Sequence, residues 1–97
     1  MRYRIRFLPL ADLDLLEIDA NLEKYPVKAS RFFETLDKQI LRLADMPMIY
    51  PVYEEVPVYR KMTVDDYLVF YVVNDETKMI DIHRIINGRM YVAKHLL

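Results

Sequence analysis

The clearest hydrophobic pattern lies between Tyr67 and Arg89, where two apolar runs rich in β-branched residues flank the polar connection 74–78. Two such runs around a short polar connection predict a β-hairpin. The first run, 67–73, is almost unbroken in Val, Leu, Phe and Tyr, which is typical of a central strand covered on at least one face. The second run, 79–86, is expected to lie beside it.

Two more segments have the pattern of strands. Residues 2–7 alternate a cation with an apolar residue, which predicts a strand with one buried face. The cations on its other face either contact nucleic acid or form a solvated surface that discourages edge pairing; they are Arg2, Arg4 and Arg6. Residues 58–63 form a short strand, and Asp65-Asp66 provides the tight connection into Tyr67.

Apolar residues at three- and four-residue spacing predict two helices between the first two strands. The first runs from about Ala11 to Lys24, and its apolar positions are Leu13, Leu16 and Ala20 beside Leu15, Ile18 and Leu22. Its early turns carry Asp12, Asp14 and Glu17, where the helix dipole favours acidic side chains. The second begins at Pro26, and its stripe, which we expect to face the sheet, comprises Ala29, Phe33, Leu36, Ile40 and Leu43. The short break at Tyr25-Pro26 predicts an antiparallel helical hairpin.

The element order is therefore β-α-α-β-β-β, an α+β fold in which a sheet packs on a helical hairpin. The loop after the second helix, 46–57, is unusually apolar for a loop. It contains three prolines, at 47, 51 and 57, which keep the segment up to Val58 out of a helix. We expect it to pack over a core edge; the alternative is a patch that binds a partner. The only glycine, Gly88, follows the last strand, and we expect it to turn the backbone with a positive φ angle.

Composition narrows the class of protein. A chain of 97 residues with 54% hydrophobic residues predicts a single globular domain over 1–97. The absence of cysteine and the presence of two histidines argue against disulfides, a metal centre or a cofactor. The N-terminus is too charged for a signal peptide, and no apolar run approaches the ~20 residues of a membrane span, so a cytoplasmic location without membrane contact is expected. With 14 basic and 15 acidic residues, any nucleic-acid contact would be local.

In this order of elements the chain resembles the RelE/ParE superfamily, the plasmid stabilisation toxins of bacterial type II toxin–antitoxin systems. The segments that carry the resemblance are Tyr59-Arg60, the strand 66–71 and the turn 84–89. The resemblance covers nearly the whole chain and implies a curved antiparallel sheet on a helical hairpin. It also implies a growth inhibitor that is neutralised by a cognate antitoxin and assembles with it or as a homodimer. The antitoxin segment is expected to meet apolar residues with basic neighbours.

The superfamily is divided by target, because RelE-like members cut messenger RNA on the ribosome whereas ParE-like members poison DNA gyrase. RNA cleavage by a ribose 2′-hydroxyl needs a proton acceptor, a proton donor and cations that hold the phosphate. In the RelE-like case the resemblance implies a metal-independent endoribonuclease in which Lys61 is a strand lysine. Arg89 and His95 would then be the catalytic residues, with His95 where the RelE pattern has a tyrosine.

Two observations favour a ParE-like protein. Leu68 stands where the RelE-like strand has a phosphate-binding arginine, and the net charge of −1 is unlike that of a protein attracted to ribosomal RNA. Residues that could still contact RNA or another target are Arg60, Lys61, His83, Arg84 and Tyr91. Arg84 lies either beside the core or after a β-bulge that redirects it into a site. A third alternative is a degenerate toxin fold that only binds its antitoxin.

Overall fold

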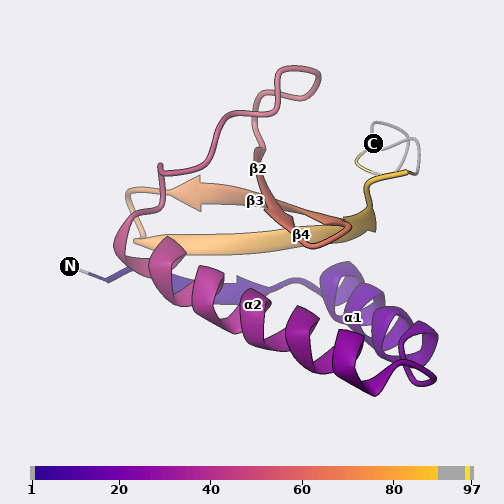
Figure 1. Cartoon of the computed structure of the whole chain (residues 1–97). Helices are drawn as coiled ribbons and strands as arrows, with labels where there is room; N and C mark the ends of the chain where they lie inside the picture. The colour runs from indigo at the N-terminus through magenta and orange to yellow at the C-terminus, as the bar shows by residue number, and fades with distance from the viewer. Residues whose placement is uncertain (1, 90–95, 97) are drawn as a thin grey trace.

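The computed structural model describes residues 2–89 and Leu96 and contains six elements (Figure 1). They are β1 (Arg4–Phe7), α1 (Pro9–Asn21), α2 (Pro26–Asp45), β2 (Arg60–Val64), β3 (Tyr67–Asn74) and β4 (Met79–Asn87). This order confirms the predicted α+β architecture. Two strands start two residues later than expected: β1 begins at Arg4 and β2 begins at Arg60. Among the described residues, no helix combines the length and apolar character needed to cross a membrane.

The sheet has the strand order β1-β4-β3-β2. β2, β3 and β4 are antiparallel neighbours, whereas β1 pairs with β4 in parallel, with Arg4 opposite Met79 and Phe7 opposite Ile82. The sheet is therefore mixed, and the expectation that it is antiparallel throughout is wrong. The reason is topological: a parallel pair needs a long crossover connection, which the helical hairpin and the β2–β3–β4 meander supply together.

Both helices cover one face of the sheet, the lower face in Figure 1. The predicted stripe on α2 belongs to the core cluster on this face or packs against it, so α2 faces the sheet as expected. However, the fully buried aromatic ring is Phe32, 1% exposed, and Phe33 is only partly buried. At about 100° per helical residue, Phe32, Leu36 and Leu43 lie along the centre of the buried face and Phe33 lies at its margin.

The expected stripe on α1 is wrong in part. Ile18 and Leu22 are buried as expected, and Ala11 is buried beside them, but Leu13 and Leu16 are 59% and 67% exposed and Ala20 is also exposed. α1 packs on the sheet through one side, so apolar residues on its opposite side face solvent. Helix α1 is thus apolar on two sides rather than amphipathic.

The loop between α2 and β2 crosses the second face of the sheet, above it in Figure 1, and covers a second apolar cluster. Tyr59, Phe70 and Ile86 are buried there, and the residues packed against them are Tyr53, Val56, Leu68, Val72 and Leu96. The rings of Tyr53 and Phe70 meet edge to face with centroids 5.1 Å apart. The prediction that this loop packs over a core edge is confirmed.

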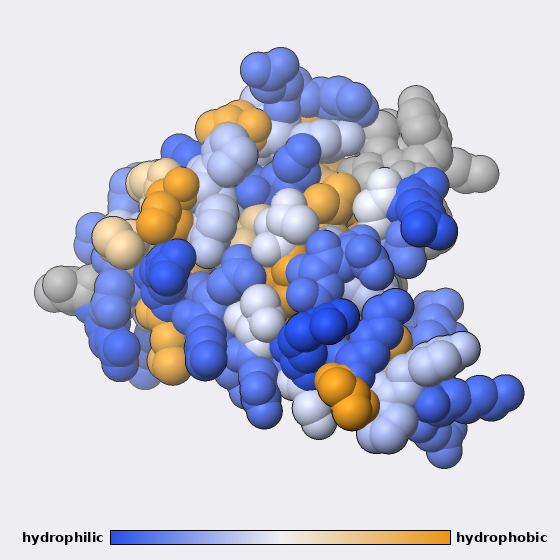
Figure 2. Space-filling model, in the orientation of Figure 1, coloured by the Kyte–Doolittle hydropathy of each residue, from blue (hydrophilic) through white to orange (hydrophobic). Residues whose placement is uncertain are grey.

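The start of the same loop is anchored to the first cluster. The Tyr71 hydroxyl donates to the Pro47 carbonyl at 3.0 Å, and burial raises the pKa of Tyr71 to about 12. Beside this anchor, Met46, Met48 and Ile49 remain exposed. Figure 2 shows apolar side chains at this end of the molecule, whereas the visible surface over α2 is mainly hydrophilic.

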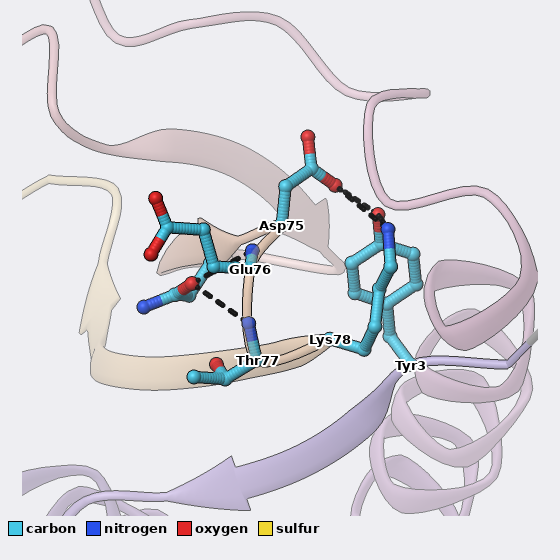
Figure 3. A network of polar contacts seen from close by, with 6 residues as sticks. Tyr3, Asp75, Glu76, Thr77 and Lys78 are labelled. Carbon is cyan, nitrogen blue, oxygen red and sulfur yellow. Dashed lines mark hydrogen bonds and ion pairs between the residues drawn. The ribbon is translucent and has the colours of Figure 1, made fainter.

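Two turns use left-handed backbone conformations at residues other than glycine. Asp65 has a φ angle of 52° in the predicted two-residue connection, and Lys78 has 56° at the end of the β3–β4 turn. In that turn the Asn74 side chain accepts the backbone N–H groups of Glu76 and Thr77 (Figure 3). The turn is tied to the N-terminal segment through Tyr3.

Tyr3 holds that turn from the end of the sheet (Figure 3). Its hydroxyl donates to the Asp75 carboxylate, and the Lys78 ammonium lies 5.2 Å from the centroid of its ring. Gly88, by contrast, does not have a positive φ angle, so that expectation is wrong. Its N–H donates to the Asp66 carbonyl at 2.9 Å, and this approach rather than left-handed backbone is its role in the turn.

Candidate functional site

A β-bulge in β4 redirects the polar residues predicted to form a site. Arg84 is opposite Phe70, but Ile82 is opposite Tyr71, so His83 is an extra residue on β4. Ile80, Ile82 and Ile85 all pack in the helix-side cluster, at a spacing of two and then three residues. Of the two alternatives for Arg84, the bulge is therefore the one that the structure shows.

Arg84 is held by an aspartate from α1. Its Nε and Nη2 atoms lie 2.8 and 2.9 Å from the two carboxylate oxygens of Asp14. Asp14 also accepts the N–H of Ile85 at 2.8 Å. The two charged side chains are only 21% and 11% exposed. The hydrogen bond with Asp14 raises the pKa of Arg84, so the guanidinium remains charged.

This ion pair joins the bulge to α1 at the place where β1 has ended. β1 pairs with β4 only as far as Ile82, and the Ile85 N–H beyond it is satisfied by a side chain rather than by a strand. A phosphate that approached Arg84 would compete with a bidentate carboxylate, which is among the strongest partners of arginine. The geometry favours a structural role for Arg84.

His83 lies on the second face of the sheet against Tyr59. The two rings meet edge to face at 5.1 Å, and Nδ1 is 3.4 Å from the Tyr59 hydroxyl oxygen. Burial lowers the pKa of His83, with Asp81 opposing the shift, so the ring is neutral at pH 7. His83 and Arg84 both line a mainly apolar hollow of about 380 Å³ with Leu8, Pro9, Leu10, Tyr59 and Leu96.

Arg60 and Lys61 are adjacent in β2 and point to opposite faces of the sheet. Arg60 Nη1 donates to the Tyr50 carbonyl at 2.8 Å and so anchors the loop. The Lys61 ammonium lies 5.7 Å from the centroid of the Tyr53 ring, in a hollow that Glu54 and Glu55 also line. The structure therefore does not bring these two cations together.

The remaining predicted residues lie at the C-terminal end. Arg89 is exposed in the turn after β4, where its backbone N–H donates to the Asn87 side chain at 2.9 Å. Tyr91 and His95 lie outside the described residues. Leu68, at the position of the RelE-like arginine, packs against the cluster of Tyr59, Phe70 and Ile86.

The second face of the sheet therefore holds a buried apolar cluster under the loop, with cations at its margins. Within residues 2–89, Tyr59, His83 and Arg84 share one hollow, but the Arg84 guanidinium there is held by Asp14. Several other cations are paired with aspartates: Arg2 with Asp45, Arg6 with Asp81, Lys28 with Asp66, Arg31 with Asp65, and Lys78 with Asp75. Two of the three arginines at the N-terminal strand are among them, which favours a solvated surface over a nucleic-acid contact.

Sequence reasoning missed Asp14 and Tyr59 as partners of the predicted site residues. The sequence places Asp14 among acidic residues that the helix dipole favours, and its neighbours give no sign of Arg84, which lies 70 positions away. Tyr59 is one of the residues that carry the family resemblance, but no local pattern places its ring against His83. A long-range pair of this kind is visible only once the bulge in β4 and the packing of α1 are known.

The order of elements, the mixed sheet and the helical hairpin define the RelE/ParE toxin fold. Three solved structures are similar, and each has less than 25% sequence identity, so they bear on the fold alone. The chromosomal ParDE system of P. aeruginosa gives a TM-score of 0.71 at 22% identity over 89% of this chain and 96% of that one. The RelBE2 complex of Mycobacterium tuberculosis has a TM-score of 0.62 at 19% identity, over 90% of this chain and 99% of that one. A mutant of E. coli RelE in the free state has a TM-score of 0.66 at 19% identity, over 100% of both chains.

Within this fold class the sequence selects one family. Residues 5–91 match the family described as the ParE toxin of the type II toxin–antitoxin system, parDE. The chain therefore belongs to the ParE toxin family, whose members are neutralised by a cognate antitoxin. No protein of curated function is significantly similar in sequence.

Proposed function

We propose that this ParE-family toxin inhibits growth by binding DNA gyrase and that it does not cut messenger RNA. The observation that carries the proposal is the position of Leu68 in the second apolar cluster. RelE-like toxins have a phosphate-binding arginine at the matching position. Leucine has no charge or hydrogen-bond donor, so it offers nothing to a phosphate as negative charge develops.

Two of the nearby cations are engaged by other groups in the described structure. Arg84 is paired with Asp14, and Arg60 is directed to the loop on the other face. The net charge of −1 also gives little long-range attraction to ribosomal phosphates. A protein–protein target is consistent with an apolar, weakly charged surface. Because gyrase is a cytoplasmic enzyme, the proposal includes a cytoplasmic location.

The test is plasmid supercoiling by purified gyrase with increasing amounts of the toxin, with relaxation by topoisomerase I as the control reaction. We expect loss of supercoiling and accumulation of linear DNA in the gyrase reaction only. Restoration by a stoichiometric amount of antitoxin would show that the inhibitor is the folded toxin. The proposal would be overturned if a toxin that arrests growth in cells left the supercoiling activity of purified gyrase unchanged.

The same preparation separates the alternatives. Ribosome-dependent cleavage of a messenger would indicate a RelE-like enzyme that uses Arg89, His95 and Lys61. Absence of growth arrest on expression without a partner would indicate a degenerate toxin that only binds its antitoxin. Under our proposal the toxin arrests growth when expressed alone, and co-expression of the antitoxin relieves the arrest through a hetero-oligomer.

A further inference from the structure

Asn87 and Gly88 form the one place in the chain where glycine follows asparagine. Asn87 is the last residue of β4, and Gly88 begins the turn that leads to Arg89. The side-chain amide of an asparagine can be attacked by the backbone nitrogen of the next residue. Glycine makes this attack easiest, because it has no Cβ beside the attacking nitrogen. The sequence therefore places its most reactive amide at the end of β4.

The turn also activates the side-chain carbonyl of Asn87. The Arg89 N–H donates to Asn87 Oδ1 at 2.9 Å. Attack on the adjoining carbon moves negative charge onto Oδ1, and an N–H already directed at that oxygen stabilises the charge as it develops. Gly88 and Arg89 are both exposed, so water and hydroxide reach the turn. The fold thus supplies a hydrogen-bond donor and open access to solvent.

One contact opposes the reaction. The Gly88 N–H donates to the Asp66 carbonyl at 2.9 Å, where the end of β4 lies beside the β2–β3 connection (Figure 1). The Gly88 nitrogen must give up this hydrogen bond before it can attack. Both residues are exposed, and hydrogen bonds at exposed chain turns open far more readily than those in the core. The contact with Asp66 therefore slows the reaction without preventing it.

We propose that Asn87 is a site of spontaneous deamidation in the folded toxin, and that the product weakens the end of the β3–β4 pairing. Hydroxide removes the Gly88 amide proton, and the nitrogen forms a bond to the side-chain carbon of Asn87. Ammonia leaves with a proton from water, which restores hydroxide, and a succinimide ring remains. Water then opens the ring at either carbonyl. One water is consumed, one ammonia is released, and residue 87 becomes aspartate or isoaspartate.

Both products change the surroundings of residue 87. Asn87 lines a hollow of about 120 Å³ with Asp14, Glu17 and Arg84, and Arg84 is already paired with Asp14. A carboxylate at position 87 adds a like charge to those of Asp14 and Glu17, which is unfavourable. Isoaspartate also places an extra carbon in the main chain where residue 87 pairs with Tyr67. The regular spacing of the strand pair is then lost at its end.

The first experiment follows the folded toxin during storage in a mildly alkaline buffer at growth temperature. Trypsin releases the asparagines at 21, 74 and 87 in separate peptides, and mass spectrometry measures the conversion of each. Asn74 is the internal control, because its side-chain oxygen also accepts backbone N–H groups but aspartate follows it. We expect Asn87 to convert at least about tenfold faster than Asn74. Equal rates would overturn the proposal.

A matched variant tests the role of the glycine. In Gly88→Ala the added Cβ would lie 3.4 Å from the Asp66 carbonyl oxygen and 3.8 Å from Leu68 Cγ, which are ordinary contact distances. The backbone at Gly88 has no positive φ angle, so alanine fits there without strain. The variant should keep the urea midpoint of the parent and convert at Asn87 at least about tenfold more slowly. Conversion at the rate of the parent would overturn the proposal.

A sample of the parent toxin in urea tests whether the reaction belongs to the folded state. Conversion at Asn87 in urea but not in buffer would place the reaction in the unfolded chain and would overturn the proposal. We expect conversion in both samples, since the exposed turn opens without unfolding of the core. This comparison does not depend on the stability of any variant.

The last experiment measures the effect of the modification on the fold. Ion-exchange chromatography separates the deamidated toxin, which carries an additional negative charge, from the parent. The deamidated fraction should unfold at a lower urea concentration than the parent, and Asn87→Asp should reproduce the part of this shift that comes from charge. Equal midpoints for all three would overturn the proposed weakening of the β3–β4 pairing. Neither gyrase nor the antitoxin takes part in these measurements, so their outcome is independent of the proposed function.

Discussion

At the scale of single residues, the contact between Asp14 and Arg84 decides how the bulge in β4 is used. One carboxylate satisfies both a guanidinium and the Ile85 N–H, and both charged groups are largely withdrawn from solvent. Removing one member of such a pair leaves its partner charge and a backbone donor without compensation. The pair therefore stabilises the fold, although Arg84 was predicted to be a residue that contacts the target.

The first prediction tests that role. Asp14→Asn should lower the free energy of unfolding by about 1–3 kcal/mol, because Arg84 loses its counter-charge in a partly buried setting. Asp19→Asn, on the exposed flank of the same helix, should change it by less than about 0.5 kcal/mol. Urea unfolding of both variants makes the comparison. Equal stability of the two would show that the Arg84 pair contributes little.

The second prediction concerns His83 and pH. Its folded-state pKa lies below the unfolded value near 6.5, so the neutral ring in the fold stabilises the protein above that value. This contribution is lost as pH falls through the lower folded-state pKa. The difference in unfolding free energy between the parent and His83→Gln should therefore shrink from about pH 7.5 to pH 5. A difference that grows on acidification would mean that protonated His83 is stabilised by the fold.

At the scale of elements, the predicted stripe of α2 lies on the correct side of the helix, but the residue at the centre of the buried face is Phe32 and not Phe33. Phe32 contacts both Phe33 and Tyr67 edge to face, with centroids 5.0 and 5.1 Å apart. The third prediction is that Phe32→Ala costs about 3–5 kcal/mol and Phe33→Ala at most about 2 kcal/mol. Chemical unfolding gives both values. A larger loss of unfolding free energy for Phe33→Ala than for Phe32→Ala would contradict the buried face assigned to α2.

The β2–β3 connection provides the fourth prediction. Asp65 has a φ angle of 52°, which costs an L-residue about 1 kcal/mol that glycine does not incur. Asp65→Gly should therefore leave stability unchanged or raise it by up to about 1 kcal/mol, despite the loss of the exposed pair with Arg31. Asp66→Gly, in the same turn without a positive φ angle, should be destabilising. Thermal unfolding distinguishes them, and a greater loss at Asp65 would contradict the assigned turn geometry.

The elements could be predicted from sequence because their signals are local. Strand alternation, the Pro26 helix start and the Asp65-Asp66 turn depend on neighbouring residues, and all three hold in the structure. The parallel pairing of β1 with β4 could not be predicted in this way, because it depends on where a distant meander returns. The same applies to α1, whose leucines at helical spacing do not reveal which side meets the sheet.

At the scale of the whole molecule, only some features of the candidate site can be predicted from the sequence. The absence of an arginine at Leu68 is visible in the sequence, whereas the packing of Leu68 under the loop depends on non-local structure. The separation of Arg60 from Lys61 follows from strand alternation. The capture of Arg84 by Asp14 could not be predicted, because the bulge and the helix contact that create it are both non-local.

The fifth prediction tests the central claim that this fold inhibits growth without RNA chemistry. Purified ribosomes programmed with a messenger are incubated with the parent toxin and with His95→Gln, and cleavage is mapped at the A-site codon. We expect no cleavage by the parent and undiminished growth inhibition by His95→Gln. Cleavage at that codon by the parent, and at least ~100-fold slower cleavage by folded His95→Gln, would identify His95 as a catalytic residue and contradict the account.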